Sequence, residues 1–415
     1  MLTSEKVAWF ASNAISLHPI DPKDRDFSDL RPLQQAIGNA RVVLLGGDDD
    51  EAVVKLRYRL VRFLHEEMGF DVLACGLPLF DAEEFDRALD LGKAPRADLQ
   101  ELNERAFEYY SRRYGMYSSI GMLNYARGTH KNGRPLHIAG LWWGVSAYGV
   151  SDYTKRLFQF LDGIHPQLAS PADRKAIQGL LDLSGPAQRA PVAFQRRRVV
   201  VDRGQWEKKL GPGVAAVEKL YAGLGLLAEG VPEDSEIVFF RQTLANLANW
   251  AAATTGRPLA MPAPDMAATL AKVFRPESKI VLWTTNVGAA RNASPPARPN
   301  GGRVPPRSPG NEFARLFGVG AYSIAFREIR NDNELLQVLE AGPQPKLAPV
   351  DGDLESLLHA AGKPYSFVDF RSVPAHHWLR APLSARLINA AETAVWPDRY
   401  DGLITIDIPA AKERK

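Results

Sequence analysis

Apolar residues along this chain fall into short uninterrupted runs separated by longer stretches with helical spacing. A short apolar run is typical of a strand that is buried on both faces. The runs that predict strands are Arg41–Leu45, Val72–Ala74, His137–Ala139, Ile280–Trp283, Ala321–Phe326, Phe367–Phe370 and Leu403–Ile406. Because amphipathic helical segments alternate with these runs, we predict an α/β fold with a largely parallel central sheet flanked by helices.

One long stretch of the chain lacks a convincing strand and repeats its apolar residues with the period of an α-helix. Its predicted helical segments are Tyr153–Leu161, Arg174–Leu183, Ala215–Leu227 and Ile237–Ala252. We therefore predict three parts: a first part of the α/β core at 1–150, a helical insertion or cap at 151–275, and a second part of the core at 276–415.

The segment Asn292–Asn311 differs from the rest in composition, with six prolines, three glycines, three arginines and no acidic residue. Such a segment is not expected to form a helix or a central strand. It follows the strand that ends at Trp283, so it leaves the sheet at the edge where ligands usually bind. Two interpretations stay open: a mobile surface loop, or a lid that closes on a ligand.

The composition is that of an ordinary globular protein, with 45% hydrophobic residues and a formal net charge of +3. This near balance gives no electrostatic reason to expect nucleic-acid or membrane binding. No run approaches the roughly 18 apolar residues that span a bilayer, and the N-terminus lacks a signal-peptide pattern, so a cytoplasmic location is expected. The single cysteine, Cys75, falls in a predicted buried strand and excludes an intrachain disulfide. We expect no cofactor, and the oligomeric state stays open.

Four consecutive acidic residues, Asp48, Asp49, Asp50 and Glu51, follow the first predicted strand and the Gly46-Gly47 turn, and lead into a helix near Ala52. In α/β sheets ligands bind at the carboxyl ends of the strands, so this acidic turn is a candidate site by position. The carboxylates have three possible uses: capping of the helix, contact with a ligand or divalent metal, or direct catalysis. A Gly-x-Ser-x-Gly nucleophile motif is absent from the sequence.

This strand, turn and helix resemble the erythromycin esterase family. The family pattern is roughly Leu-Gly-Glu-Ala-Thr-His-Gly, then a helix with Lys/Arg-His-Arg-Leu-x-Arg-Tyr-Leu, then Gly-Phe and a strand that ends in glutamate. On this pattern Gly46 matches the first glycine, Gly47 replaces the glutamate and Asp50 replaces the catalytic histidine. Gly76 stands at the end of the second strand in place of the second glutamate.

The resemblance continues downstream, where Ser278–Arg291 is similar to the family segment Lys-Ile-Val-x-Trp-Ala-His-Asn-x-His. Lys279, Trp283 and Asn286 are kept, whereas Thr285 and Gly288 replace the two histidines. In the segment after Leu136, Trp142 replaces the usual aspartate.

The resemblance implies a divergent family member whose framework persists while the expected catalytic side chains are replaced. We predict a pseudoenzyme of secondary metabolism that binds, or performs altered chemistry on, a small polyketide-like or macrocyclic molecule. One alternative is an active hydrolase that uses the Asp48–Glu51 carboxylates, with or without a divalent metal, and another is a non-catalytic scaffold. The predicted catalytic residues are Asp50 and Glu51, and the predicted substrate-binding residues are Asp48, Asp49, Arg57, Gly76, Trp142, Thr285, Asn286 and Gly288.

Overall fold

The computed structural model forms two compact units, one from Met1–Phe70 with Lys279–Lys415 and one from Asp71–Ser278. It describes residues 3–19, 21–47, 51–90, 119–142, 145, 150–189, 203–228, 235–255, 277–292, 308–329, 352–388 and 390–407. The three sequence parts, 1–150, 151–275 and 276–415, divide the chain differently from these units and stay a prediction.

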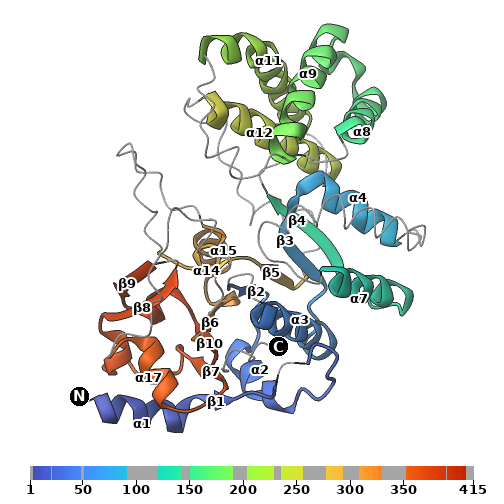
Figure 1. Ribbon diagram of the computed structural model, residues 1–415. Coiled ribbons are helices and arrows are strands. Elements are labelled where there is room, and N and C mark those ends of the chain that lie inside the picture. Colours follow the sequence, from blue (N-terminus) through green and yellow to red (C-terminus); the bar gives the residue numbers. More distant parts are fainter. Residues whose placement is uncertain are drawn as a thin grey trace, which may run out of the picture. The chain divides into compact units, whose positions relative to one another are not determined.

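A mostly parallel sheet forms the centre of the first unit (Figure 1). Its strands are β1 (Ile15–Ser16), β2 (Val42–Leu45), β5 (Ile280–Trp283), β6 (Ala321–Glu328), β7 (Tyr365–Asp369) and β10 (Gly402–Ile406). Their order in the sheet is β1-β7-β10-β6-β2-β5. The strands β10, β6, β2 and β5 run parallel, while β7 pairs antiparallel with β10 and β1. The predicted α/β fold with a largely parallel sheet is confirmed.

The central strands are short apolar runs, and every residue of β2, β5 and β10 is buried. Such continuous burial is expected for parallel strands that are covered on both faces. The helices of this unit are α1 (Thr3–Asn13), η1 (Ser28–Leu30), α2 (Arg31–Ile37), α3 (Glu51–Met68), α14 (Asn286–Ala289), α15 (Pro309–Phe317), η4 (Gly318–Gly320), α17 (Leu354–Ala360), η5 (Trp378–Arg380) and α18 (Trp396–Arg399). Among them α3, α14 and α15 contact β6.

A separate antiparallel hairpin of β8 (Leu383–Ile388) and β9 (Ala390–Ala394) completes the first unit. The strand periodicity did not predict this two-stranded sheet. Trp396, which is fully buried, donates its indole N–H to the Leu383 carbonyl over 2.9 Å and thereby ties α18 to the hairpin.

The second unit holds the parallel strands β3 (Val72–Pro78) and β4 (His137–Trp142), with α4 (Leu79–Asp90) and α7 (Ser119–Lys131). Its other helices are α8 (Val150–Ile164), η3 (Pro166–Leu168), α9 (Pro171–Arg189), α11 (Arg203–Ala228) and α12 (Ser235–Thr255), which share one apolar core. The four helical segments predicted from the sequence lie within α8, α9, α11 and α12. In the part of the chain that is described, no strand occurs between residues 151 and 275.

Two expectations about local structure were wrong. Gly76 does not end the second strand, because β3 continues through the buried Leu77 to Pro78 with a shift of register after Cys75. The end of the proline-rich segment is helical, because Ser308 caps α15 and Pro309 occupies its first turn, where the missing N–H costs nothing. Residues 293–307 lie outside the described part of the chain.

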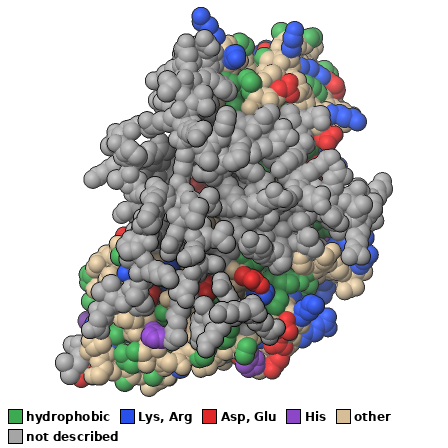
Figure 2. All heavy atoms as spheres, viewed as in Figure 1, with side chains coloured by type: hydrophobic (Ala, Val, Ile, Leu, Met, Phe, Trp, Pro, Cys, Tyr) green, Lys and Arg blue, Asp and Glu red, His purple; other side chains and the backbone are tan. Residues whose placement is uncertain are grey.

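Cys75 is a free thiol and is buried, as the sequence predicted. Its burial raises the pKa of the thiol to about 12, so the thiolate is not formed near neutral pH. None of the helices in the described ranges is long and apolar enough to cross a membrane. On the face shown in Figure 2, acidic and basic side chains are interspersed.

Candidate functional site

The carboxyl ends of β2 and β5 carry most of the predicted site residues that belong to the first unit. Backbone pairing extends past the strand ends, since Thr284 N–H bonds the Leu45 carbonyl at 3.0 Å and Gly46 N–H bonds the Ile324 carbonyl at 2.9 Å. The two turns that follow, at Gly46-Gly47 and at Thr284–Asn286, therefore start from fixed positions beside each other.

Asn286 holds the turn after β5 against β6. Its side-chain amide donates to the Phe326 carbonyl at 2.7 Å, and its carbonyl oxygen accepts the Phe326 N–H at 3.0 Å. The buried Tyr400 hydroxyl donates to the Asn286 backbone carbonyl at 2.9 Å. The oxygen and the nitrogen of the side-chain amide are thus both bonded to the backbone of β6, and a ligand at Asn286 would compete with these bonds.

Thr285 and Gly288, which stand where the family carries histidines, shape the first turn of α14. Thr285 is exposed and caps the helix by accepting the Gly288 N–H on its hydroxyl at 3.1 Å. A Cβ atom at position 288 would overlap the Thr284 hydroxyl. The first turn of α14 therefore depends on a hydroxyl at position 285 and on the absence of a side chain at position 288.

The glycines after β2 are required by space and by backbone conformation. A Cβ at Gly46 would lie 2.5 Å from the Asn286 side-chain oxygen. Gly47 has φ +111°, and a Cβ there would lie 2.7 Å from Val53 Cγ1 and 3.0 Å from Phe326 Cβ. An L-residue at position 47 meets both strain and crowding.

Arg57 brings a buried cation to this edge from α3. Its guanidinium, in a side chain only 1% exposed, donates to the Thr284 carbonyl at 3.0 Å and stacks 4.5 Å from the centre of the Trp283 ring. Trp283 is 9% exposed, and its buried indole N–H has no hydrogen-bond partner among the described residues. The edge thus holds a nearly buried tryptophan ring stacked against a fixed positive charge.

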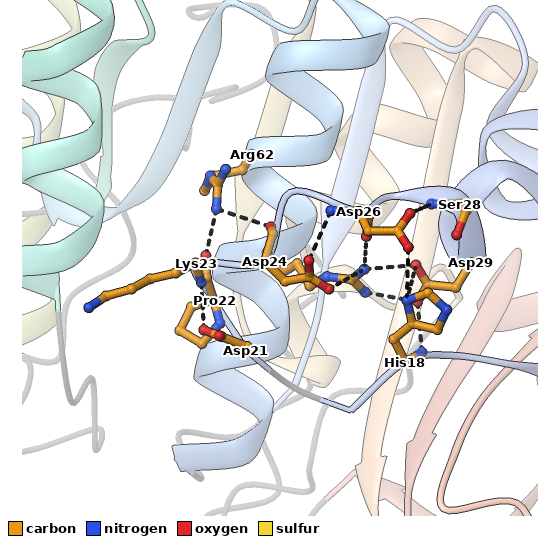
Figure 3. Close-up of polar contacts among 10 residues, drawn as sticks. His18, Asp21, Pro22, Lys23, Asp24, Asp26, Ser28, Asp29 and Arg62 are labelled. Atoms are coloured by element: carbon orange, nitrogen blue, oxygen red, sulfur yellow. Dashed lines mark hydrogen bonds and ion pairs between the residues drawn. The ribbon is translucent and has the colours of Figure 1, made fainter.

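A network of ion pairs fixes α3, which carries Arg57, to the preceding chain. Arg59 lies two residues on, nearly opposite Arg57 around the helix. It donates to both oxygens of Asp29 at 2.7 and 2.8 Å, and both side chains are almost fully buried. Figure 3 shows Arg62 reaching the backbone carbonyls of Pro22 and Asp24, at 2.8 and 3.2 Å.

Asp29 is ionised in this network. Burial alone would raise the pKa of its carboxyl group, but the Arg59 hydrogen bonds, the His18 N–H at 2.8 Å and the Arg59 charge outweigh burial and hold the pKa below its usual value. The pair therefore stays charged at neutral pH and keeps α3 in place.

The C-terminus of α3 is closed by the Gly69-Phe70 sequence. Gly69 adopts the left-handed conformation with φ +71°, and Phe70 N–H bonds back to the Leu64 carbonyl at 3.0 Å. The Lys279 ammonium donates to the Met68 carbonyl at 3.0 Å and lies over the Phe70 ring. Lys279, which the family pattern retains, thus has a structural role.

The other predicted site residues are Glu51, the three aspartates before it, and two residues of the second unit. Glu51 begins α3, is exposed and pairs with Lys55 at 2.5 Å, a contact of small energetic weight at the surface. Asp48, Asp49 and Asp50 lie outside the described residues. Gly76 and Trp142 belong to β3 and β4 of the second unit, and Gly76 has open space where a Cβ would stand.

Trp283 and Thr284 were absent from the predicted set of site residues. Both lie where a ligand was expected to bind, because they stand at the carboxyl end of β5 beside Arg57. The signal that could have found them was the retained tryptophan of the family pattern.

Comparison with known proteins places this arrangement in context. The erythromycin esterase family model matches residues 65–408. YbfO of Bacillus subtilis (strain 168), whose name assigns it to the hydrolases without naming a substrate, is 21% identical over 425 residues, covering 96% of this chain and 90% of YbfO.

Three solved structures are similar over nearly the whole chain. A Bacillus cereus protein has a TM-score of 0.72 at 17% identity, covering 98% of both chains. A succinoglycan biosynthesis protein has a TM-score of 0.67 at 15% identity, covering 98% of this chain and 97% of that one. A mutant of the erythromycin esterase EreC in its open conformation has a TM-score of 0.62 at 16% identity, covering 94% and 96%. At these identities the likeness shows the fold alone.

Proposed function

Since the chain belongs to the erythromycin esterase family, we propose that it is a divergent member without the family's histidine-dependent hydrolysis. It binds, or performs altered chemistry on, a small polyketide-like or macrocyclic molecule at the carboxyl edge of β2 and β5. In this proposal the protein is a pseudoenzyme of secondary metabolism.

The conformation of Gly47 carries this proposal. The family pattern has a glutamate at this position, and a carboxylate beside a histidine is what ester hydrolysis by an activated water needs. Here the backbone takes a φ of +111° and leaves no room for a Cβ. Restoring the glutamate would require a different turn, which supports a site whose backbone is adapted to the absence of that side chain.

The turn after β5 supports the same interpretation. Thr285 is used as the cap of α14, and Gly288 sits against Thr284 without space for a side chain. Histidines at these positions would remove the cap and crowd the helix. Three of the replaced positions therefore have local structures that fit the residues present.

Arg57 and Trp283 support retention of ligand binding. A tryptophan face suits the apolar body of a polyketide, and its indole N–H together with the Arg57 charge suits the carbonyl oxygens of such a molecule.

We expect purified protein to leave erythromycin and other macrocyclic lactones intact at the rate of buffer alone, because a neutral-pH base is missing from the expected positions. Ring opening is followed by mass spectrometry over hours near neutral pH. Enzyme-dependent ring opening that Asp50→Ala abolishes would replace this proposal with the hydrolase built on the acidic turn.

The same macrocycles should quench tryptophan fluorescence saturably, and Trp283→Phe should remove most of that change. Trp9→Phe is the matched control, because Trp9 lies on α1 against His377 and Trp378. If no macrocycle in a broad panel binds, or if Trp9→Phe and Trp283→Phe behave alike, ligand binding at this edge is excluded and the scaffold alternative gains.

A further inference from the structure

Three potential metal ligands meet in the second unit, and none of them is among the predicted site residues. Asp86 comes from α4, His130 from the last turn of α7, and His137 from the first position of β4. One ligand atom from each of the three lies within 4.8 Å of the others. No other group of three histidine, cysteine or carboxylate side chains within such reach occurs among the described residues.

The distances suit one small cation. His137 Nδ1 lies 2.9 Å from Asp86 Oδ2, whereas His130 Nε2 lies 3.9 Å from the other oxygen, Oδ1, and 3.3 Å from the Leu136 carbonyl oxygen. A tetrahedral Zn²⁺ with bonds of about 2.0–2.1 Å holds its ligand atoms about 3.4 Å apart. One atom from each side chain already lies within 4.8 Å of the other two, so side-chain shifts of about 1 Å, with release of the His130 contact to Leu136, bring the three atoms around one ion.

The surroundings of the trio orient its members. The Asp86 Oδ1 accepts the Ile138 N–H at 2.6 Å, which fixes the carboxylate against the start of β4. The short connection from α7 to β4 is closed by the Leu136 N–H, which donates to the Thr129 hydroxyl at 2.9 Å. Hydrogen bonds to a ligating carboxylate and a rigid connection between ligands are the features that preorganise metal sites.

Burial and charge also favour a cation. The side chains of His130, Asp86 and His137 are 6%, 14% and 26% exposed, so the trio is shielded but open at His137. Two neutral imidazoles and one carboxylate carry one negative charge, which a divalent ion overcompensates while one coordination position stays open for water.

We propose that Asp86, His130 and His137 form a binding site for one Zn²⁺ ion. The nitrogen-rich set favours zinc and its transition-metal neighbours over Mg²⁺ or Ca²⁺, which prefer oxygen ligands. His137 binds through Nδ1 and carries its proton on Nε2. The ion links α4, α7 and β4 at the amino end of β4, about 16 Å along the strand from Trp142. The site belongs to the second unit alone, and its fourth coordination position is left for water.

The test uses the untagged full-length chain, first freed of metal with a chelator. Isothermal titration with Zn²⁺ is expected to show one site per chain, and thermal unfolding should shift upward saturably with Zn²⁺ or Co²⁺ but not with Mg²⁺. His137→Asn and His130→Asn should each weaken Zn²⁺ binding at least tenfold, in line with the effect of losing a metal-site residue. Circular dichroism verifies that each variant is folded.

His359→Asn is the matched control. His359 Nδ1 bonds Asp407 Oδ2 at 2.7 Å, so it forms a histidine–carboxylate pair like that of His137, but it belongs to no trio among the described residues. This variant should bind Zn²⁺ like the wild type. If one trio variant does not fold, Asp86→Asn serves in its place, because the amide oxygen can still accept the Ile138 N–H. Absence of saturable binding by the wild type, or equal loss in His359→Asn, overturns the proposal.

Discussion

Arg59→Met is expected to destabilise the first unit by about 3–5 kcal/mol, the usual effect of leaving a buried charge without its partner. The methionine fills similar volume, but Asp29, whose side chain is 2% exposed, loses both guanidinium hydrogen bonds. Because the chain forms two compact units, the effect is best followed locally, by hydrogen exchange of peptides from α3 in increasing urea.

Arg31→Met provides the control for this prediction. Arg31 pairs with Glu67 at the same kind of distance, 3.0 Å, but its side chain is 56% exposed. Loss of this surface ion pair should lower the free energy of unfolding by at most about 1 kcal/mol. Similar protection losses in the two variants would show that the buried pair contributes no more than a surface pair.

The pH dependence of the Arg59 effect has a defined sign. Since the pKa of Asp29 is lower in the folded chain, the stability that it contributes is present above its unfolded pKa, near 3.8, and is lost as pH falls through the folded value. The difference between wild type and Arg59→Met should therefore be constant near neutral pH and shrink below about pH 4. A difference that grows in acid would contradict this assignment.

Gly47→Ala is expected to cost about 2–4 kcal/mol, because it adds a strained left-handed conformation to crowding against Val53 and Phe326. Urea unfolding followed by hydrogen exchange of β2 and α3 peptides measures the loss. Gly47→Glu, which restores the residue of the family pattern, should be at least as destabilising and should not confer lactone hydrolysis.

Two glycines separate the contributions of strain and crowding. Gly318 has φ +54° and open space where a Cβ would stand, so Gly318→Ala should cost about 1 kcal/mol from strain alone. Gly76 has neither a positive φ nor a close neighbour, and Gly76→Ala should change stability by less than about 0.5 kcal/mol. If all three alanine variants behave alike, position 47 is not specially constrained.

The sequence predicted the central strands because each is a continuous apolar run, such as the one from Ile280 to Trp283. A strand that is buried on both faces is apolar throughout and does not alternate with polar residues. It did not predict the β8–β9 hairpin, because the exposed and polar positions of Ala390–Ala394 carry little hydrophobic signal. The sequence did not predict the helical start at Pro309, because proline breaks the interior of a helix although the first turn accepts it.

The candidate site was only partly predictable for a different reason. Strand order and family resemblance pointed to Arg57, Thr285, Asn286 and Gly288, which the fold does place at one edge. Local sequence does not reveal which polar groups the framework uses, and the Asn286 amide bonds β6 at a position 40 residues away. Local sequence does not reveal the trio of Asp86, His130 and His137 either, because Asp86 and His137 are 51 residues apart.

The ends of the proline-rich segment are joined by hydrogen bonds, with Asn292 N–H bonding the Asn311 side chain at 2.6 Å and the Ser308 hydroxyl bonding the Ala290 carbonyl at 2.8 Å. These two bonds hold the turn after β5 against the start of α15 without help from the residues between them. Residues 293–307, which the two anchors flank, are therefore expected to accept an insertion. In the laboratory they are the place to graft an epitope or a fluorescent tag while β5 and α15 remain anchored.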